Sequence, residues 1–287
     1  MILIADSGAT KTAWRLILPQ QHALQARTAG INPYFSSPQA IASELTDVLL
    51  PQLQAAGALQ VAEQVRQVFF YGTGCGAEEN RQLVAKVLQK VFPAAAVHVD
   101  TDMLGAARAL CGKQPGIACI LGTGSHAALF NGEQIEQYAV NLGFWLGDEG
   151  SGGHLGKQLI TDYLNGDLPK DLHDFFAKRY AITREEVLEN AYKKPMPARY
   201  MASFSKFLFD HLSHPFVYRM VYNSFCAFLD KRVLKFPDAK KLPLHFTGSV
   251  AFYYANVLRR AAADKGLHIQ HILEEPVAGL VLYHGTC

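Results

Sequence analysis

The chain has 287 residues, of which 49% are hydrophobic and 18% are charged, and its net charge is +2. This composition excludes an intrinsically disordered chain and is enough for one large domain or two smaller ones with sizeable cores. A charge balance so close to neutral gives no support for a nucleic-acid or membrane-surface partner.

The first third of the chain alternates apolar runs with amphipathic ones. An apolar strand is predicted at residues 2–5, a tight turn at 6–12 and a return strand at 13–18. A helix is predicted at 39–50, where Pro38 precedes a helical periodicity. We then expect a buried strand at 68–71, a glycine-rich turn at 72–76, a helix at 78–92, a strand at 97–100 and a helix at 103–111.

The opening pattern returns in the second part of the chain. Residues 117–121 predict an apolar strand, 122–125 a turn of Gly, Thr and Ser, and 127–130 a return strand, after which Asn131-Gly132 is a strong hairpin signal. A third strand at 244–246 leads into a turn at 247–249 and a helical run at 250–265, which Gly266 is placed to end. Residues 158–235 are predicted to be mostly helical with a break at 194–197, and residues 276–284 to form a last helix.

This repetition indicates a duplicated α/β chain. Each half begins with a strand, a Gly/Thr/Ser turn and a second strand. Gly and Pro cluster at 112–116, so we expect a first domain at 1–113 and a second at 114–274. The helix at about 275–287 is expected to pack back on the first domain.

The three turns at 6–12, 122–125 and 247–249 each follow an apolar strand and combine glycine with hydroxyl residues. Backbone N–H groups of such turns can point at a phosphate, glycine lets the backbone come close, and hydroxyls donate further hydrogen bonds. One such turn is common in hairpins, but three in one chain favour a nucleotide-phosphate site. None has the P-loop sequence or a G-x-G-x-x-G that opens a helix, which disfavours P-loop proteins and dinucleotide-binding Rossmann domains.

The five cysteines include no C-x-x-C pair and no Cys/His metal spacing. Reduced thiols in a cytoplasmic protein are the simplest explanation. The N-terminus has neither a basic region nor a cleavage site, so we expect no signal peptide, and no apolar stretch approaches the roughly 20 residues of a membrane span.

These motifs carry a resemblance to known proteins that covers essentially the whole chain. Residues 6–12 resemble the first phosphate motif of the superfamily of actin, sugar kinases and heat-shock ATPases, residues 121–125 its second phosphate motif, and residues 247–251 its adenosine motif. Residues 141–152, which contain Gly-Asp-Glu-Gly-Ser, resemble the signature of N-acetylglucosamine kinases in the BadF/BadG/BcrA/BcrD ATPase family.

The resemblance implies two ribonuclease H-like α/β domains of the actin-like ATPase fold, with ATP and a sugar in the cleft between them. For ATP it implies Gly8, Thr10, Lys11, Gly122, Thr123, Gly124, Gly248 and Ser249. For the sugar it implies Asn32, Asp102, His126, Asn141, Leu142, Gly143 and Asp148. Asp102 would be the general base for phosphoryl transfer, and Asp6 would hold Mg²⁺ through water.

Ordinary structural roles compete for some of these residues in the first domain. Asp6 can be a turn-forming aspartate that bonds its own backbone, and Lys11 a solvated turn lysine. Asp102 can be the N-cap of the helix that follows it, and Asp100 is the neighbouring carboxylate that could be the base instead.

In the second domain the alternatives concern the signature and its neighbours. Asp148 and Glu149 can be an acidic pair favoured by a helix N-terminus, an account that explains Glu149 better than Asp148. His126 stands where many relatives carry Asn. Its larger, titratable ring leaves the exact sugar or its acyl group open.

The favoured function is transfer of the γ-phosphoryl group of ATP to a hydroxyl, expected to be the 6-hydroxyl, of N-acetylglucosamine or a closely related amino sugar. N-acetylmuramic acid and glucose stay open as acceptors. An ATPase activator of a radical dehydratase would need cysteines for an iron–sulfur cluster, and the chain has no matching pair. A nucleotide-gated filament or chaperone would leave Asp148 without a role.

We expect a sugar as the binding partner and neither nucleic acid nor a membrane. A homodimer stays open.

Overall fold

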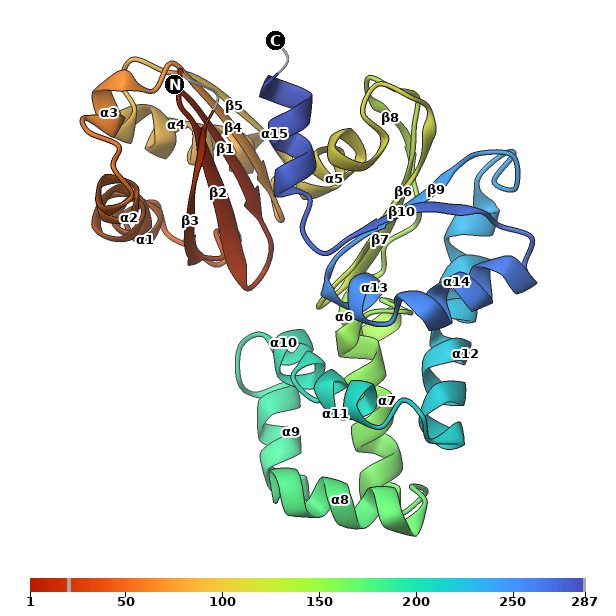
Figure 1. Cartoon of the computed structure of the whole chain (residues 1–287). Coiled ribbons are helices and arrows are strands. Elements are labelled where there is room, and N and C mark those ends of the chain that lie inside the picture. The colour runs from red at the N-terminus through yellow and green to blue at the C-terminus, as the bar shows by residue number, and fades with distance from the viewer. Residues whose placement is uncertain (20–21, 286–287) are drawn as a thin grey trace. The chain divides into compact units, whose positions relative to one another are not determined.

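The computed structural model describes residues 1–19 and 22–285, and these divide into two compact units. Unit 1 contains Met1–Gln114, the short segment Gly132–Gln134 and the chain from Glu275 onward. Unit 2 contains Pro115–Asn131 and Ile135–Glu274. Each unit holds a mixed five-stranded sheet with helices, which confirms the predicted α/β fold class (Figure 1).

The sheet of unit 1 has the strand order β3-β2-β1-β4-β5. Its strands are β1 (Ile2–Ser7), β2 (Lys11–Ile17), β3 (Ala23–Ala29), β4 (Gln67–Gly72) and β5 (Ala96–Thr101). β2 is antiparallel to both β1 and β3, whereas β4 is parallel to both β1 and β5. The carboxyl ends of β1, β4 and β5 therefore meet at one edge, where the sequence places polar residues.

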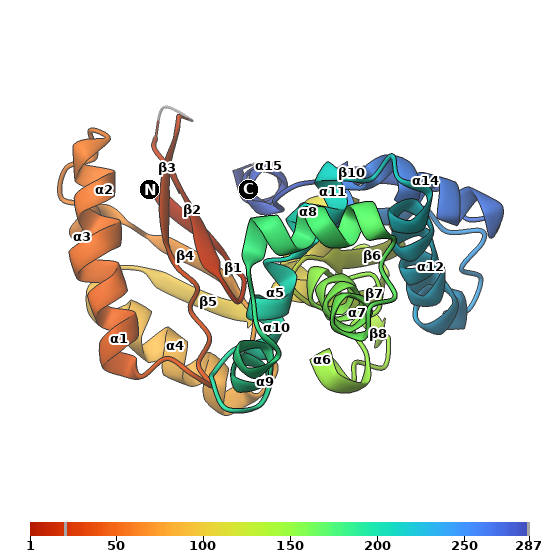
Figure 2. The ribbon, with the colours of Figure 1, turned by 90° about the horizontal axis from the view of Figure 1, so that it is seen from below.

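Helices cover both faces of this sheet. They are α1 (Pro38–Ser43), a π-helical segment (Glu44–Leu49), α2 (Leu50–Ala55), α3 (Val61–Gln64), α4 (Glu78–Val91), α5 (Asp102–Cys111) and α15 (Val277–Gly285). Within unit 1, α1 to α4 lie on one face and α5 and α15 on the other, as Figures 1 and 2 both show. The first face is apolar and forms a single core with residues such as Leu3, Trp14 and Phe70.

The face of the same sheet that α15 covers is partly polar. The Tyr71 hydroxyl lies 2.8 Å from Nε2 of His284 in α15 and accepts a hydrogen bond of 2.8 Å from Arg108 in α5. Phe69 stacks on the His284 ring with centroids 3.8 Å apart. Burial lowers the pKa of His284 to about 4, so this ring is neutral and fixes α15 to the sheet at neutral pH.

The sheet of unit 2 has the order β10-β9-β6-β7-β8. Its strands are β6 (Gly116–Leu121), β7 (Ser125–Phe130), β8 (Ile135–Tyr138), β9 (Leu244–Thr247) and β10 (Ile269–Leu273). Its helices are α6 (Gly143–Leu146), α7 (Gly152–Asn165), α8 (Lys170–Tyr180), α9 (Arg184–Tyr192), α10 (Pro197–Ala202), α11 (Ser205–Asp210), α12 (Pro215–Lys231), a 3₁₀ turn (Val233–Lys235), α13 (Ser249–Tyr253) and α14 (Ala255–Asp264). One large core joins these helices to β6, β7 and β9.

Three predicted elements differ in detail from the structure. The helix predicted to end at residue 50 continues to Ala55, because the π-helical turn before Pro51 changes the hydrogen-bond pattern where proline has no N–H to donate. The helical run at 250–265 breaks at Tyr254 into α13 and α14. The last helix ends at Gly285, and Cys287 lies outside the described residues. Within residues 1–19 and 22–285, no helix has the length and apolar character needed to cross a bilayer.

Candidate active site

The first glycine turn connects β1 to β2 in unit 1. The N–H of Gly8 donates to the carbonyl of Lys11 at 3.0 Å, and the N–H of Gly30 donates to the carbonyl of Thr10 at 3.2 Å. A Cβ on Gly30 would lie 2.4 Å from the carbonyl oxygen of Gly8, so only glycine lets the chain after β3 approach the turn this closely. The structure therefore places Gly8, Thr10 and Lys11 in one tight loop.

Asn32, two residues after Gly30, lies beside the glycine-rich turn that follows β4 in unit 1. Its Oδ1 accepts a hydrogen bond from the N–H of Tyr34 at 3.0 Å. Gly74 has a φ of +81°, and a Cβ there would lie 2.3 Å from Oδ1 of Asn32. The amide of Asn32 is thus held in one orientation next to the turn that follows β4.

Asp102 is the first residue of α5, and Asp6 lies near the end of β1. The N-cap of α5 is Thr101, whose hydroxyl accepts from the N–H of Leu104 at 3.1 Å, so the N-cap role considered for Asp102 is wrong. Oδ1 of Asp102 instead accepts from the N–H of Met103 at 2.9 Å. Burial raises the pKa of Asp102 to about 6, although hydrogen bonds from the backbone of Met103 and the Thr73 side chain act to lower it. This carboxylate ionises near neutral pH, as a general base requires.

Asp6 has an environment of the same kind. Burial is the main cause that raises its pKa to about 7, followed by the charges of Asp102 and Glu275, while Lys11 opposes the rise.

In the described part of the chain no three His, Cys, Asp or Glu side chains gather to hold a metal by themselves. Mg²⁺ is commonly held by one or two carboxylates together with substrate phosphates, so the poorly compensated pair of Asp6 and Asp102 fits that ion.

Asp100 also lies on this part of the sheet. In register it is the partner of Tyr71, which is the partner of Asp6, so the three side chains share one face. Oδ1 of Asp100 accepts from the N–H of Thr101 at 2.8 Å. Its carboxylate is therefore tied to its own backbone at the end of β5.

The second glycine turn connects β6 to β7 in unit 2. The N–H of Gly122 donates to the carbonyl of Gly124 at 3.0 Å. The first two residues of α7 bind the turn from outside, since the N–H groups of Gly152 and Gly153 donate to the carbonyls of Gly122 and Thr123 at 2.8 and 3.0 Å. The turn and the start of α7 therefore form one rigid piece.

The adenosine-motif turn lies against this piece. Gly248 has a φ of +111°, and its N–H donates to the carbonyl of Leu273 at 3.1 Å. A Cβ on Gly248 would lie 2.4 Å from the carbonyl oxygen of Leu121 and 3.2 Å from the backbone nitrogen of Gly122. Within unit 2, the structure thus brings together the predicted ATP residues Gly122 and Gly248, and Ser249 starts α13 beside them.

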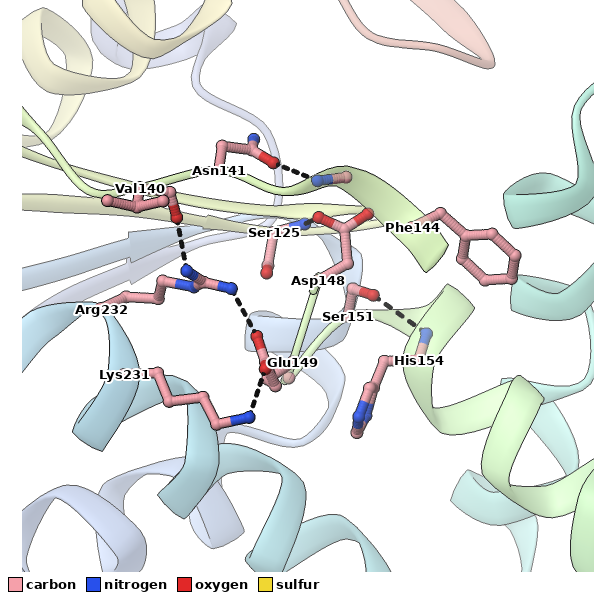
Figure 3. A network of polar contacts seen from close by, with 12 residues as sticks. Ser125, Val140, Asn141, Phe144, Asp148, Glu149, Ser151, His154, Lys231 and Arg232 are labelled. Carbon is pink, nitrogen blue, oxygen red and sulfur yellow. Dashed lines mark hydrogen bonds and ion pairs between the residues drawn. The ribbon is translucent and has the colours of Figure 1, made fainter. Parts of the chain in front are cut away.

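Asp148 is a buried carboxylate at the same place. Its Oδ1 accepts from the N–H of Ser125 at 3.3 Å, and a Cβ on Gly124 would lie 3.0 Å from its Oδ2 (Figure 3). Burial raises the pKa of Asp148, and the N–H of Ser125 and the charge of Arg232 act against this rise. Its φ of +58° is a left-handed conformation that aspartate and asparagine tolerate better than most residues. This geometry presents a carboxylate beside the glycine turn rather than at a helix N-cap, which Ser151 occupies.

The remaining predicted sugar residues of unit 2 all precede Asp148 in sequence. Oδ1 of Asn141 accepts from the N–H of Gly143 at 2.8 Å, and Gly143 has a φ of +66° (Figure 3). Leu142 between them is exposed. His126 on β7 is half-buried and stacks on Tyr138, with centroids 5.6 Å apart, and burial lowers its pKa.

Sequence reasoning missed the partners of Glu149. Arg232 donates to Glu149 at 2.8 Å and to the carbonyl of Val140, and Lys231 donates to Glu149 at 2.7 Å (Figure 3). Although burial alone raises the pKa of Glu149, these hydrogen bonds outweigh it and lower the pKa to about 2. The ion pairs fix the segment that carries Asp148. Their sequence signal was an adjacent Lys and Arg within the region 158–235 that was predicted to be mostly helical.

The predicted site residues thus form two groups. Asp6, Gly8, Thr10, Lys11, Asn32 and Asp102 belong to unit 1, and Gly122, Thr123, Gly124, His126, Asn141, Leu142, Gly143, Asp148, Gly248 and Ser249 belong to unit 2. One group offers two carboxylates beside a glycine turn. The other offers two adjoining glycine turns with a buried carboxylate.

Among solved structures, the chain is similar to a Porphyromonas gingivalis protein described as "Putative N-acetylglucosamine Kinase". The two are 42% identical, the match covers 100% of this chain and 99% of that one, and the TM-score is 0.93. A Chromobacterium violaceum protein with the same description is 20% identical over 98% of both chains, with a TM-score of 0.74. A ROK family glucokinase from Streptomyces griseus, solved with glucose and AMPPNP, is 15% identical over 100% of this chain and 98% of that one, with a TM-score of 0.59.

The last two similarities show the shared fold alone. No protein-family model and no curated protein matches the chain. The Porphyromonas gingivalis protein is similar over its whole length and at an identity that indicates common descent. The chain therefore belongs to the same family of sugar kinases as that protein, with the actin-like fold of two α/β domains.

Proposed function

We propose that this sugar kinase transfers the γ-phosphoryl group of ATP to the 6-hydroxyl of N-acetylglucosamine. The sugar is suggested by the name of the Porphyromonas gingivalis protein and by the signature at residues 141–152. The observation that carries the reaction type is the position of Asp102 at the start of α5, where the N–H of Met103 holds its carboxylate near that of Asp6. The solved glucokinase bound to AMPPNP supports ATP as the donor.

In the proposed reaction the residues of unit 1 act on the hydroxyl and the phosphates. Asp102 accepts the proton of the sugar hydroxyl while the hydroxyl oxygen of the sugar forms a bond to the γ-phosphorus. The bond from that phosphorus to the bridging oxygen breaks, and ADP leaves with the electron pair. Thr10 and Lys11 would bind phosphate oxygens, and Gly8 would let the turn come close to them. Mg²⁺ held near Asp6 would offset the charge of the phosphates.

The residues of unit 2 would bind the remainder of both substrates. The turns at Gly122–Gly124 and Gly248–Ser249 would contact the nucleotide, because their glycines let the backbone come close to it. Asp148 would accept hydrogen bonds from two sugar hydroxyls, which a carboxylate can do with its two oxygens. His126 is the residue from which we expect an effect on the acyl group, because it replaces the asparagine of many relatives.

A coupled assay with ATP and Mg²⁺ over a panel of sugars tests this function. We expect the highest kcat/KM with N-acetylglucosamine, less with glucose and N-acetylmuramic acid, and no product from the 6-deoxy analogue. Phosphorus NMR of the product identifies the phosphorylated hydroxyl. Phosphorylation of the 6-deoxy analogue would contradict the position, and a clear preference for another sugar would contradict the substrate.

A further inference from the structure

Glu275 is a poorly exposed carboxylate in contact with two cationic side chains. It lies where the chain passes from unit 2 into unit 1, and its side chain is 16% exposed. The ammonium of Lys11 donates to Oε1 of Glu275, and Nη2 of Arg27 lies 3.1 and 3.2 Å from its two oxygens. Burial acts to raise the pKa of Glu275, but Lys11, Arg27 and Arg15 together lower it, so the carboxylate is ionised.

The strand register explains why these cations gather. Lys11, Ala13 and Arg15 alternate along β2 and therefore lie on one face. Arg27 of β3 is directly opposite Ala13, which adds a third cation to that face. Packing of α15 against β1 and β2 brings the segment just before it, with Glu275, to the same place.

Lys11 has a second anionic partner in the proposed function. It follows directly on the turn Gly8–Thr10, where the phosphates of the nucleotide are proposed to bind. A lysine carries its charge on a flexible four-carbon stem, so its ammonium can reach either of two neighbouring anions. The side chain is 48% exposed and is therefore free to move toward solvent and the turn.

We propose that Glu275 competes with the phosphates of the nucleotide for Lys11 and so weakens nucleotide binding, which speeds the release of ADP. When a phosphate binds the ammonium of Lys11, the charge of Glu275 is still compensated by Arg27 and Arg15. The loss of Lys11 therefore leaves no isolated carboxylate. The proposal rests on the proposed function, because it assigns the turn to phosphate. It adds a residue outside the motifs that sets the affinity for the nucleotide.

Calorimetric titration with ADP and Mg²⁺ tests this competition in four proteins: the wild type, Glu275→Gln, Lys11→Met and the double variant. Release of Lys11 from one partly exposed ion pair, worth about 0.2–1 kcal/mol, corresponds to an affinity gain of up to about 5-fold. We therefore expect Glu275→Gln to bind ADP about 2- to 5-fold more tightly, with a slower dissociation in stopped-flow measurements. In the Lys11→Met background the same substitution should change the affinity less than about 2-fold, because no lysine is left to release.

Two further variants distinguish competition for Lys11 from a general effect of removing a negative charge and from destabilisation of the fold. Glu274→Gln removes the same charge one residue earlier, from a carboxylate that accepts from the Tyr253 hydroxyl at 3.1 Å, and should leave the affinity unchanged. Arg27→Met should weaken ADP binding, because Glu275 then depends more strongly on Lys11. General destabilisation would move Glu275→Gln and Arg27→Met in the same direction.

The proposal is overturned if Glu275→Gln leaves ADP binding unchanged or weaker, or if it tightens binding equally in the Lys11→Met background. The latter result would mean long-range repulsion between Glu275 and phosphate rather than competition for Lys11. If the wild type bound neither ADP nor ATP, the proposed function itself would fail, which is a separate outcome.

Discussion

Asp6 and Asp102 lie close enough for the charge of one carboxylate to disfavour ionisation of the other. Burial is the largest cause that raises the pKa of Asp6 to about 7, and the charge of Asp102 is the next. The two side chains come from the end of β1 and the start of α5, elements separated by most of unit 1 in sequence. Such a pair suits a division of work in which one carboxylate holds a cation and the other accepts a proton.

The first prediction concerns the proton acceptor. Asp102→Asn keeps the shape of the side chain but removes its basic group, and general-base assistance is typically worth about 10²–10⁴ in rate. We expect kcat to fall by that factor in steady-state assays, with little change in the KM for the sugar. Asp100→Asn is the matched control, because it makes the same change in the neighbouring carboxylate, whose Oδ1 accepts from the N–H of Thr101 just as Oδ1 of Asp102 accepts from that of Met103. A larger loss of kcat in the Asp100 variant would show that the base has been misassigned.

The second prediction concerns Asp148. Hydrogen bonds to a charged group are worth about 1.5–3 kcal/mol, so Asp148→Asn should raise the KM for the sugar by about 10- to 100-fold and affect kcat less. Asparagine tolerates the φ of +58° found at this position, and the N–H of Ser125 keeps an acceptor. Thermal unfolding should therefore change little. A fall in kcat with an unchanged KM would contradict a role in sugar binding.

The repeated strand–turn–strand units were accessible to sequence reasoning because they are local. β1 with β2 and β6 with β7 are adjacent in sequence, and each pair is joined by a turn whose glycines are visible in the sequence. The edge strands β3, β8 and β10 were missed. Exposed positions in each carry polar residues, so none of the three segments shows a continuous apolar run.

The ion pairs of Glu149 illustrate what sequence reasoning could not reach. Its partners Lys231 and Arg232 are 82 and 83 positions away, and only the packing of α12 against α7 brings them near. For the same reason Glu275 carried no signal, since Lys11 is 264 positions away. The roles of Asp6, Asp102 and Asp148 stay predictions that the variants above would test.

The third prediction separates two glycines of unit 2. Gly248→Ala would force a left-handed conformation on alanine, which costs about 1–3 kcal/mol, and its Cβ would overlap the carbonyl oxygen of Leu121 at 2.4 Å. We expect at least this loss in the free energy of unfolding, measured by urea denaturation. At Gly122 a Cβ would meet no atom within 4 Å, so Gly122→Ala should keep its stability. Equal stability losses in both variants would contradict this account of Gly248.

The fourth prediction concerns the acid stability of the segment that carries Asp148. The pKa of Glu149 is about 2 in the folded protein against an ordinary 4.5, because Lys231 and Arg232 outweigh its burial. A group with a lowered folded pKa stabilises the protein fully above its unfolded pKa and loses that effect as pH falls through the folded value. Glu149→Gln leaves the buried Arg232 without its anion, and loss of one partner of a buried pair costs about 3–5 kcal/mol. At pH 7 we therefore expect the free energy of unfolding, measured by urea denaturation, to be lower than in the wild type by an amount on the order of 3 kcal/mol.

This difference between the variant and the wild type should shrink between pH 4.5 and pH 2, where the wild type loses the same contribution. Glu185→Gln, at an exposed carboxylate 3.7 Å from Arg184, is the control and should be neutral. A deficit that stayed constant down to pH 2 would mean that Glu149 stabilises the protein through packing rather than through its charge.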